Sequence, residues 1–218
     1  GCFFLDLLPS VLMIHHLSTN NNSQFSISRN IKNFPYRFME NRAVQRAEAI
    51  IVPSHHTYNQ LLAVYPQAKH KTSIVYEPLK LTPSAHKRTL PQDAQHTLIL
   101  CPGLAREKRK GGISLIEALK LLDREFSYKV LVTGKSREGN WGKLFIKKIH
   151  ESGFEDKFEM LGEVSRRRLI RLYEKSDLVV FPSLFEGYGI PVVEAMMLGK
   201  PVIATRTGEA EYFIKNNV

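Results

Sequence analysis

From Thr97 onward the chain alternates between apolar segments of strand length and longer segments with the apolar period of a helix. The strand-like segments are Leu98–Cys101, Tyr128–Thr133, Lys157–Leu161, Leu178–Phe181 and Val202–Thr205. The helix-like segments between them are Ile113–Asp123, Trp141–Ser152, Ser165–Lys175 and Pro191–Leu198. Because alternation of this kind is built from βαβ units, it predicts an α/β fold whose parallel sheet has helices on both faces.

The first part of the chain has the same pattern in a less regular form. Its expected strands are Val11–His15, Ala49–Val52 and Thr72–Val75, and its expected helices are Tyr36–Ala47 and His56–Val64. A polar stretch with three prolines follows and is typical of a linker. We therefore predict a partial first lobe at 1–80, a linker at 81–96 and a second lobe at 97–218. Both ends look cut, so we interpret the chain as a fragment in which the first lobe is incomplete and the second is truncated.

Composition indicates where the chain resides and what it binds. Its two cysteines, Cys2 and Cys101, are expected to be reduced core thiols, which makes the cytoplasm the default compartment. The longest apolar run, Cys2–Ile14, is too short and too interrupted to span a bilayer. A net charge of +10 favours anionic partners such as phosphorylated ligands or an acidic membrane surface. The basic stretch Arg166–Arg171 is interpreted mostly as a solvated helix face, and no nucleic-acid partner is expected because no recognisable binding motif occurs.

The stretch Phe181–Thr205 combines a glycine-rich turn with two carboxylates. Gly187 and Gly189 lie in the turn, where glycine allows positive φ and close approach of a ligand to the backbone. Glu186 and Glu194 are separated by seven residues, so the first is placed to bind hydroxyls of a sugar and the second to accept hydrogen bonds from a ribose diol. The alternative is an ordinary strand–turn–helix with solvated glutamates.

The helix that follows this turn supplies the complement for phosphate. Pro191 suits the first helical turn, where its missing N–H costs nothing. The backbone N–H groups from Tyr188 through Ile190 to Val192 are then expected to point toward the end of the preceding strand, with the positive end of the helix dipole behind them. A nucleotide diphosphate sugar presents the matching phosphates, ribose and hexose.

The same stretch resembles the Glu–seven residues–Glu signature of the retaining GT-B glycosyltransferases of family four, including its Pro-Ser lead-in and EGYGIP core. Further blocks of similarity are Leu98–Gly103, Lys110-Gly111, Leu115–Leu119, Leu161–Val164, Leu169–Tyr173 and Ala47–Ser54. The resemblance spans nearly the whole chain. It implies a GT-B fold of two Rossmann-like lobes with parallel sheets and a donor bound in the cleft between them.

The resemblance also implies roles for basic residues. Lys110 is expected to neutralise the donor diphosphate as charge builds on the leaving group. In many relatives an arginine directly follows the glycine at the end of the first strand of the second lobe. That glycine is Gly103 in this chain, and Leu104 follows it. Arg109 and Arg106 are therefore taken as its substitutes, Arg109 for the reaction and Arg106 for donor binding.

Two further positions follow from the family. His16, with His15 as its neighbour, stands after the first strand, where relatives carry a histidine near the reacting sugar. Val164 and Glu163 lie at a strand end that meets the base through backbone groups. The implied catalytic residues are His16, Arg109, Lys110 and Glu186, and the implied donor-binding residues are Gly103, Arg106, Val164, Gly187, Tyr188, Gly189, Ile190 and Glu194.

No metal or other cofactor is expected, because the chain has no Asp-x-Asp pair of the kind that holds a divalent cation on a diphosphate. The implied function is transfer of a sugar from a UDP- or GDP-type donor to a carbohydrate or lipid-linked acceptor hydroxyl with retention of configuration. Bacterial surface polysaccharide, lipopolysaccharide or glycolipid synthesis would be its setting, at the inner face of the membrane. The first alternative is a non-catalytic GT-B protein that binds nucleotide sugars, or an inactive fragment. The second is an α/β protein that binds nucleic acid through its positive charge.

Overall fold

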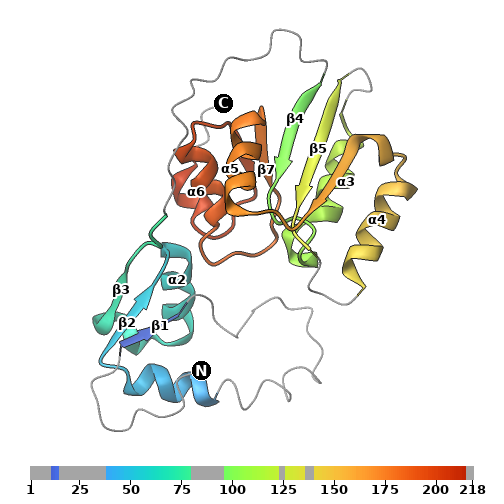
Figure 1. Cartoon of the computed structure of the whole chain (residues 1–218). Coiled ribbons are helices and arrows are strands. Elements are labelled where there is room, and N and C mark those ends of the chain that lie inside the picture. Colours follow the sequence, from blue (N-terminus) through green and yellow to red (C-terminus); the bar gives the residue numbers. More distant parts are fainter. Residues whose placement is uncertain (1–10, 15–37, 80–95, 123–125, 136–139, 215–218) are drawn as a thin grey trace. The chain divides into compact units, whose positions relative to one another are not determined.

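The computed structural model describes residues 11–14, 38–79, 96–122, 126–135 and 140–214. They form two compact units (Figure 1). Unit 1 comprises the described residues up to Pro78 together with Glu186–Tyr188 and those from Tyr212 onward. Unit 2 comprises the described residues within Leu79–Phe185 and Gly189–Glu211. Of the predicted linker at 81–96, the structure describes His96, so the predicted lobe boundaries stay a prediction.

Unit 1 is built on a parallel three-stranded sheet in the order β1-β2-β3. Its elements are β1 (Val11–Met13), a helix over residues 38–46, β2 (Ala49–Val52), α2 (His55–Val64), the 3-10 helix η1 (Pro66–Lys71) and β3 (Thr72–Ile74). Buried apolar side chains from the sheet and both helices, among them Val44, Ile50 and Leu61, form one core. The strands and helices expected here are confirmed as far as the described residues extend, with ends that differ by one or two residues.

Unit 2 contains a parallel five-stranded sheet in the order β6-β5-β4-β7-β8. The strands are β4 (Thr97–Cys101), β5 (Tyr128–Thr133), β6 (Phe158–Gly162), β7 (Leu178–Phe181) and β8 (Val202–Ala204), so every strand predicted for this region is confirmed. Along the chain, β5 and β6 are added on one side of β4, and β7 and β8 are then added on its other side. In sheets of this type, ligands bind beyond the carboxyl ends of the strands at the point where the order reverses. That point lies between β4 and β7.

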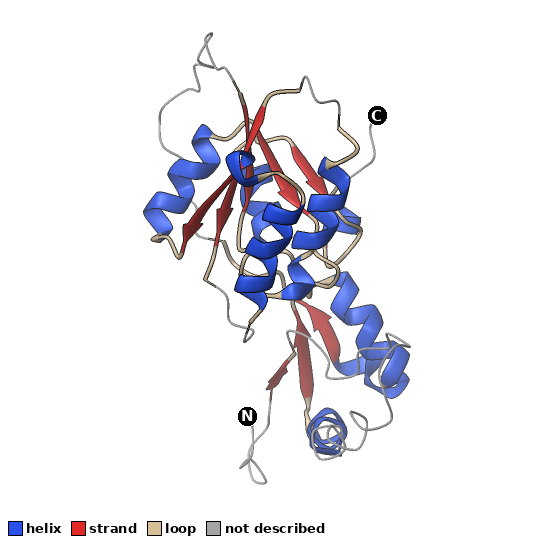
Figure 2. Cartoon of the chain, turned by 90° about the vertical axis from the view of Figure 1, so that its right-hand side faces the viewer, coloured by secondary structure: helices blue, strands red, loops and turns tan. Residues whose placement is uncertain are grey.

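Helices cover both faces of this sheet (Figures 1 and 2). Side chains alternate along β4, so Ile99 and Cys101 pack with α3 (Gly112–Leu119) and α4 (Trp141–Glu151). Leu100 packs on the opposite face with Tyr173 of α5 (Arg166–Lys175) and Ala195 of α6 (Ile190–Met197). Burial raises the pKa of the Cys101 thiol, as expected for a core cysteine. The described residues also include the short helices η2 (Lys108–Lys110), η3 (Glu155–Lys157) and α7 (Ala210–Phe213).

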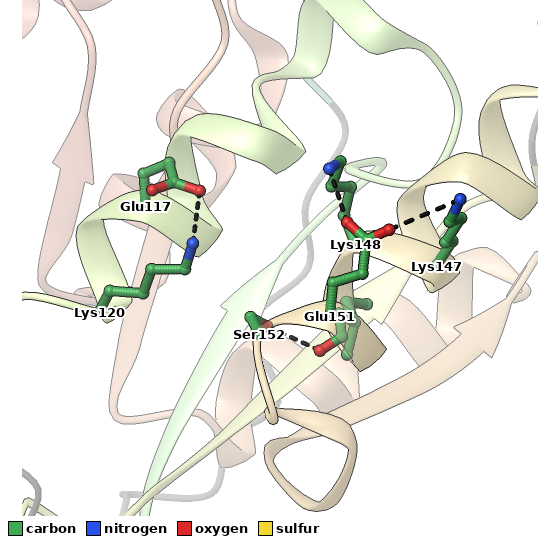
Figure 3. A network of polar contacts seen from close by, with 7 residues as sticks. Glu117, Lys120, Lys147, Lys148, Glu151 and Ser152 are labelled. Carbon is green, nitrogen blue, oxygen red and sulfur yellow. Dashed lines mark hydrogen bonds and ion pairs between the residues drawn. The ribbon is translucent and has the colours of Figure 1, made fainter.

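The solvent-facing sides of α3 and α4 carry ion pairs (Figure 3). Lys120 Nζ lies 2.8 Å from a carboxylate oxygen of Glu117, and Glu151 pairs with Lys148 at 2.6 Å and Lys147 at 3.6 Å. The hydrogen bond from Lys148 lowers the pKa of Glu151. Exposed pairs of this kind add little to stability. The basic residues of α4 therefore form a solvated helix face. None of the helices in the described part of the chain is long and apolar enough to cross a membrane.

Candidate functional site

Turns at the carboxyl ends of β4, β5 and β6 are tied to one another by hydrogen bonds. The Gly103 N–H donates to the Thr133 hydroxyl at 3.0 Å, and the Gly134 N–H donates to the Gly162 carbonyl at 2.7 Å. Gly103 lies after β4. Thr133 is the last residue of β5, Gly134 follows it, and Gly162 is the last residue of β6. The edge of the sheet where a ligand is expected is therefore held by hydrogen bonds from two glycine amides, one to the Thr133 hydroxyl and one to a backbone carbonyl.

Arg106 lies across these turns. A Cβ added at Gly134 would come within 2.7 Å of the Arg106 Cγ, so the absence of a side chain at that glycine makes room for the arginine. The Arg106 guanidinium lies 3.5 Å from a carboxylate oxygen of Glu163, beyond the end of β6, and the two side chains are 38% and 59% exposed. An exposed pair of this kind is weak, so the arginine can exchange it for a stronger anion. The next residue, Val164, is half-buried.

Arg109 connects the loop after β4 to the loop after β7. Its Nη1 donates to the Phe185 carbonyl at 2.9 Å, its Nε donates to Glu107, and its own carbonyl accepts from the Leu184 N–H at 2.7 Å. These contacts give Arg109 a definite role in holding the two loops together. Its assignment to the reaction stays a prediction.

The turn Lys110-Gly111 is in direct contact with the end of β7. Gly111 has φ of +79°, and a Cβ at this position would lie 1.8 Å from the Pro182 carbonyl oxygen. Only glycine fits such an approach. The Lys110 ammonium consequently lies 5.4 Å from the centre of the Phe181 ring, at cation–π distance. The lysine is thus placed next to the point where the strand order reverses.

Helix α6 begins at the same end of β7. Gly189 precedes it in the left-handed conformation, with φ of +92°, and Pro191 occupies its first turn as expected. The Val192 N–H donates to the Gly189 carbonyl at 2.9 Å, so the expectation that this amide would be available for phosphate is wrong. Ile190 is half-buried at the helix start. Gly199, in the left-handed conformation, follows the end of the helix.

Glu194 is buried within α6, with 3% of its surface exposed. One carboxylate oxygen accepts from the Tyr173 hydroxyl at 2.9 Å, and the other accepts from Arg166 Nη1. Burial, and next the charge of Glu194, raise the pKa of Tyr173, which keeps this hydroxyl a donor. The alternative of a solvated glutamate is therefore wrong for Glu194. Arg166 lies on the exposed face of α5, as interpreted, and its guanidinium in addition binds Glu194.

Arg166 and Tyr173 are the site residues that the sequence did not single out. The Ser165 hydroxyl accepts from the Arg168 N–H and starts α5, which places Arg166 at the first helical position. Tyr173 lies seven residues further, so both fall on the side of α5 that faces α6. The helical spacing of Arg166 and Tyr173, just after a strand, can be recognised in the sequence. The sequence does not reveal that both side chains would contact Glu194.

Glu186, Gly187 and Tyr188 group with unit 1. The Gly187 carbonyl accepts from the Ser54 hydroxyl at 2.6 Å, and the Tyr188 ring centre lies 6.2 Å from that of Tyr76. Glu186 is buried, with 8% exposed. Gly187 is not among the described glycines with positive φ, whereas Gly189 is. The sugar-binding role of Glu186 stays a prediction, and His16 with His15 lies outside the described residues.

The described residues contain no group of three or more histidine, cysteine, aspartate or glutamate side chains that could hold a metal ion. What the described site offers is cationic and amide groups at the strand ends, contributed by Arg106, Lys110 and the start of α6, beside one buried carboxylate. Such a set matches an anion joined to a polyol.

Known proteins with similar sequences are glycosyltransferases. An uncharacterized glycosyltransferase of Methanocaldococcus jannaschii is 29% identical over 93% of this chain and 52% of its own length. The D-inositol 3-phosphate glycosyltransferase of a Mycobacterium species is 27% identical over 82% of this chain and 42% of its length. The O-antigen chain mannosyltransferase of Salmonella typhimurium is 25% identical over 78% of this chain and 45% of its length. The chain thus spans about half the length of the curated relatives it matches.

Solved structures share the fold of this chain. The HepE protein of Anabaena, crystallised with UDP and glucose, superposes with a TM-score of 0.75 and 23% identity over 96% of this chain and 56% of its own. Its complex with UDP-glucose gives a TM-score of 0.74 and 22% identity over 96% and 57%. The α/β fold with parallel sheets is thus close to that of GT-B glycosyltransferases. Residues 85–218, more than half of the sequence, match the family described as Glycosyl transferases group 1, and the chain belongs to that family.

Proposed function

We propose that this chain carries the donor site of a glycosyltransferase that moves a sugar from a nucleotide diphosphate sugar to an acceptor hydroxyl. The observation that supports the proposal most is the contact of the Lys110-Gly111 turn with Pro182. With this contact, the Lys110 ammonium lies 5.4 Å from the Phe181 ring at the end of β7, and α/β sheets commonly bind nucleotides where the strand order reverses. The Anabaena HepE protein, which has a similar fold, was crystallised with UDP-glucose.

In the proposed reaction the bond between the anomeric carbon and the diphosphate breaks, and the acceptor oxygen bonds to that carbon. Negative charge grows on the leaving diphosphate, and the ammonium of Lys110 lowers the barrier by neutralising it. Arg106, whose ion pair with Glu163 is exposed and weak, adds a second cation. Glu194 accepts hydrogen bonds from the ribose hydroxyls, and Glu186 and His16 are assigned to the transferred sugar.

We further propose that transfer proceeds with retention of configuration and without a metal ion. Three kinds of cationic or polar group, Lys110, Arg106 and the N-terminus of α6, are proposed to balance the charge that a divalent cation balances in other glycosyltransferases. The acceptor is proposed to be a carbohydrate or a lipid-linked hydroxyl at the inner face of the bacterial membrane. A relative that builds O-antigen and the net charge of +10 support this setting.

A binding and turnover experiment tests the proposal. Thermal unfolding is followed with UDP-, GDP- and ADP-sugars and with EDTA present, and donor hydrolysis or transfer is followed with radiolabelled sugar in the full-length protein. One nucleotide type is expected to raise the melting temperature, and transfer is expected to continue in EDTA. Lys110→Ala is expected to lower turnover roughly 100-fold while donor affinity changes little, because the lysine acts mainly on developing charge.

Lys120→Ala is the matched control, since it removes a lysine whose partner is exposed on α3. It is expected to leave both affinity and turnover unchanged. Donor binding without transfer or hydrolysis in the full-length protein would refute the enzymatic part and leave a nucleotide-sugar-binding protein. Lack of binding by any of the three donor types would refute the donor site itself.

A further inference from the structure

Glu194 is held at both of its carboxylate oxygens by residues of α5. The Tyr173 hydroxyl binds Oε2 on the buried side at 2.9 Å, and Arg166 Nη1 binds Oε1 from the solvent side. The Glu194 side chain is 4% exposed and that of Arg166 is 45% exposed. A carboxylate held at one oxygen alone can rotate about its terminal bond, whereas one held at both cannot.

Arg166 also supplies the charge that a buried carboxylate needs. A buried charge is costly unless it is paired and hydrogen-bonded, and the Arg166 guanidinium is the cationic partner of the Glu194 carboxylate. Tyr173 cannot supply this charge, because burial and Glu194 raise its pKa and it stays a neutral donor. A carboxylate accepts hydrogen bonds at about four positions.

We propose that Arg166 is a positioning residue that sets the preference of this site for a ribonucleotide. The inference rests on the proposed function. Each Glu194 oxygen can accept about two hydrogen bonds, and a residue of α5 occupies one position on each oxygen. About two positions therefore remain, which is the number that the two hydroxyls of a ribose require. A 2′-deoxyribose fills one of them and leaves the other unpaired in a buried place, which is unfavourable.

This role differs from that of a general cationic attraction. Arg167 and Arg168 are neighbours of Arg166 on the exposed first turn of α5 and carry the same charge. Removal of any of the three weakens the field that attracts a diphosphate. Only the removal of Arg166 frees a Glu194 oxygen. The difference in affinity between a ribonucleotide and its 2′-deoxy form should therefore depend on Arg166 if the arginine positions Glu194. It should not depend on Arg166 if the arginine only adds positive charge.

The test compares UDP, GDP and ADP with their 2′-deoxy counterparts by isothermal titration calorimetry. The full-length wild-type protein is expected to bind one ribonucleotide roughly 10-fold or more tightly than its deoxy form, the effect of one hydrogen bond to a charged group. In Arg166→Ala, affinity for the ribonucleotide is expected to fall about 10-fold and affinity for the deoxy form less than about 3-fold, so the two become similar. Arg166→Lys is expected to restore part of the preference.

Arg167→Ala is the matched control and is expected to lower both affinities by the same small factor. Arg166→Met keeps much of the side chain's length but has no donor for the Glu194 oxygen, and it replaces Arg166→Ala if that variant does not fold, with the same expected loss of preference. An unchanged ribose preference in the folded Arg166 variants overturns the inference while leaving the donor site intact. Tighter ribonucleotide binding in Arg166→Ala also overturns it, since the arginine would then block the site. No binding by the wild-type protein overturns the proposed function, and the inference with it.

Discussion

Gly111 shows at the scale of one residue how the two loops of the proposed donor site are brought together. Its φ of +79° places it in the left-handed region, and the Pro182 carbonyl occupies the space where a side chain would begin. The neighbouring Lys110 and the loop that starts the Glu–seven residues–Glu signature consequently meet. The sequence identified Lys110 through family resemblance, whereas the structure shows why the residue after it is glycine.

We predict that Gly111→Ala disrupts both stability and donor binding. The added Cβ would overlap a backbone oxygen at 1.8 Å, so one of the loops must move. We expect a loss of more than about 3 kcal/mol in unfolding free energy, measured by urea denaturation, because strain and overlap act together. Gly153→Ala is the control, since φ there is +70° but no atom lies within 4 Å of the added Cβ. It should cost about 1–2 kcal/mol from backbone strain and leave donor affinity unchanged. Equal losses in both variants would contradict the argument.

At the scale of elements, two helices begin with serine caps in different surroundings. Ser54 caps α2 by accepting from the Thr57 N–H at 2.9 Å, and it is fully buried. Its hydroxyl also donates to the Gly187 carbonyl at 2.6 Å, within the same unit. Ser165 caps α5 by accepting from the Arg168 N–H at 3.3 Å, in an exposed position. Water can replace the second cap but not the first.

We therefore expect the two serine-to-alanine variants to differ in stability. Ser165→Ala should lower the unfolding free energy by roughly 0.5–1 kcal/mol, the usual effect of an exposed cap. Ser54→Ala should lower it by roughly 2–3 kcal/mol, because it removes a buried cap and leaves the partly buried Gly187 carbonyl with the longer hydrogen bond from Thr57. Denaturation by urea, followed by circular dichroism, measures both. A smaller loss for Ser54→Ala than for Ser165→Ala would show that the buried hydrogen bonds do not matter.

Sequence pattern predicted the elements of unit 2 well because each strand is an apolar run bounded by glycine or proline. β7 was predicted with its observed bounds, and the ends of α6 were marked by Pro191 and Gly199. The partners of Glu194 were not predictable in the same way. Arg166 lies 28 residues away in sequence, and its contact depends on how α5 and α6 pack on the sheet. Local pattern gives periodicity and caps, whereas side-chain pairing depends on tertiary packing.

At the scale of the whole molecule, each unit has a core of its own. The core of unit 1 contains Val44, Ile50 and Leu61, and unit 2 has one core on each face of its sheet. The single tryptophan of the chain, Trp141, is buried in unit 2 at 5% exposure and stacks on Phe145. Tryptophan fluorescence therefore reports the unfolding of unit 2, while circular dichroism reports helices of both units.

This difference allows a test of where the donor is held. Lys110, Arg106 and Glu194 belong to unit 2, so a donor at 100 times its dissociation constant should stabilise that unit by about 2.7 kcal/mol. For a domain of this size the fluorescence transition should then rise by roughly 10 °C. A lower-melting component that appears in circular dichroism alone should move less. In Glu194→Gln, which keeps an acceptor for Tyr173, the fluorescence shift should shrink at the same donor concentration, because a neutral amide is a weaker acceptor. If the donor binds and the tryptophan transition does not move, the ligand is held elsewhere than at these residues of unit 2.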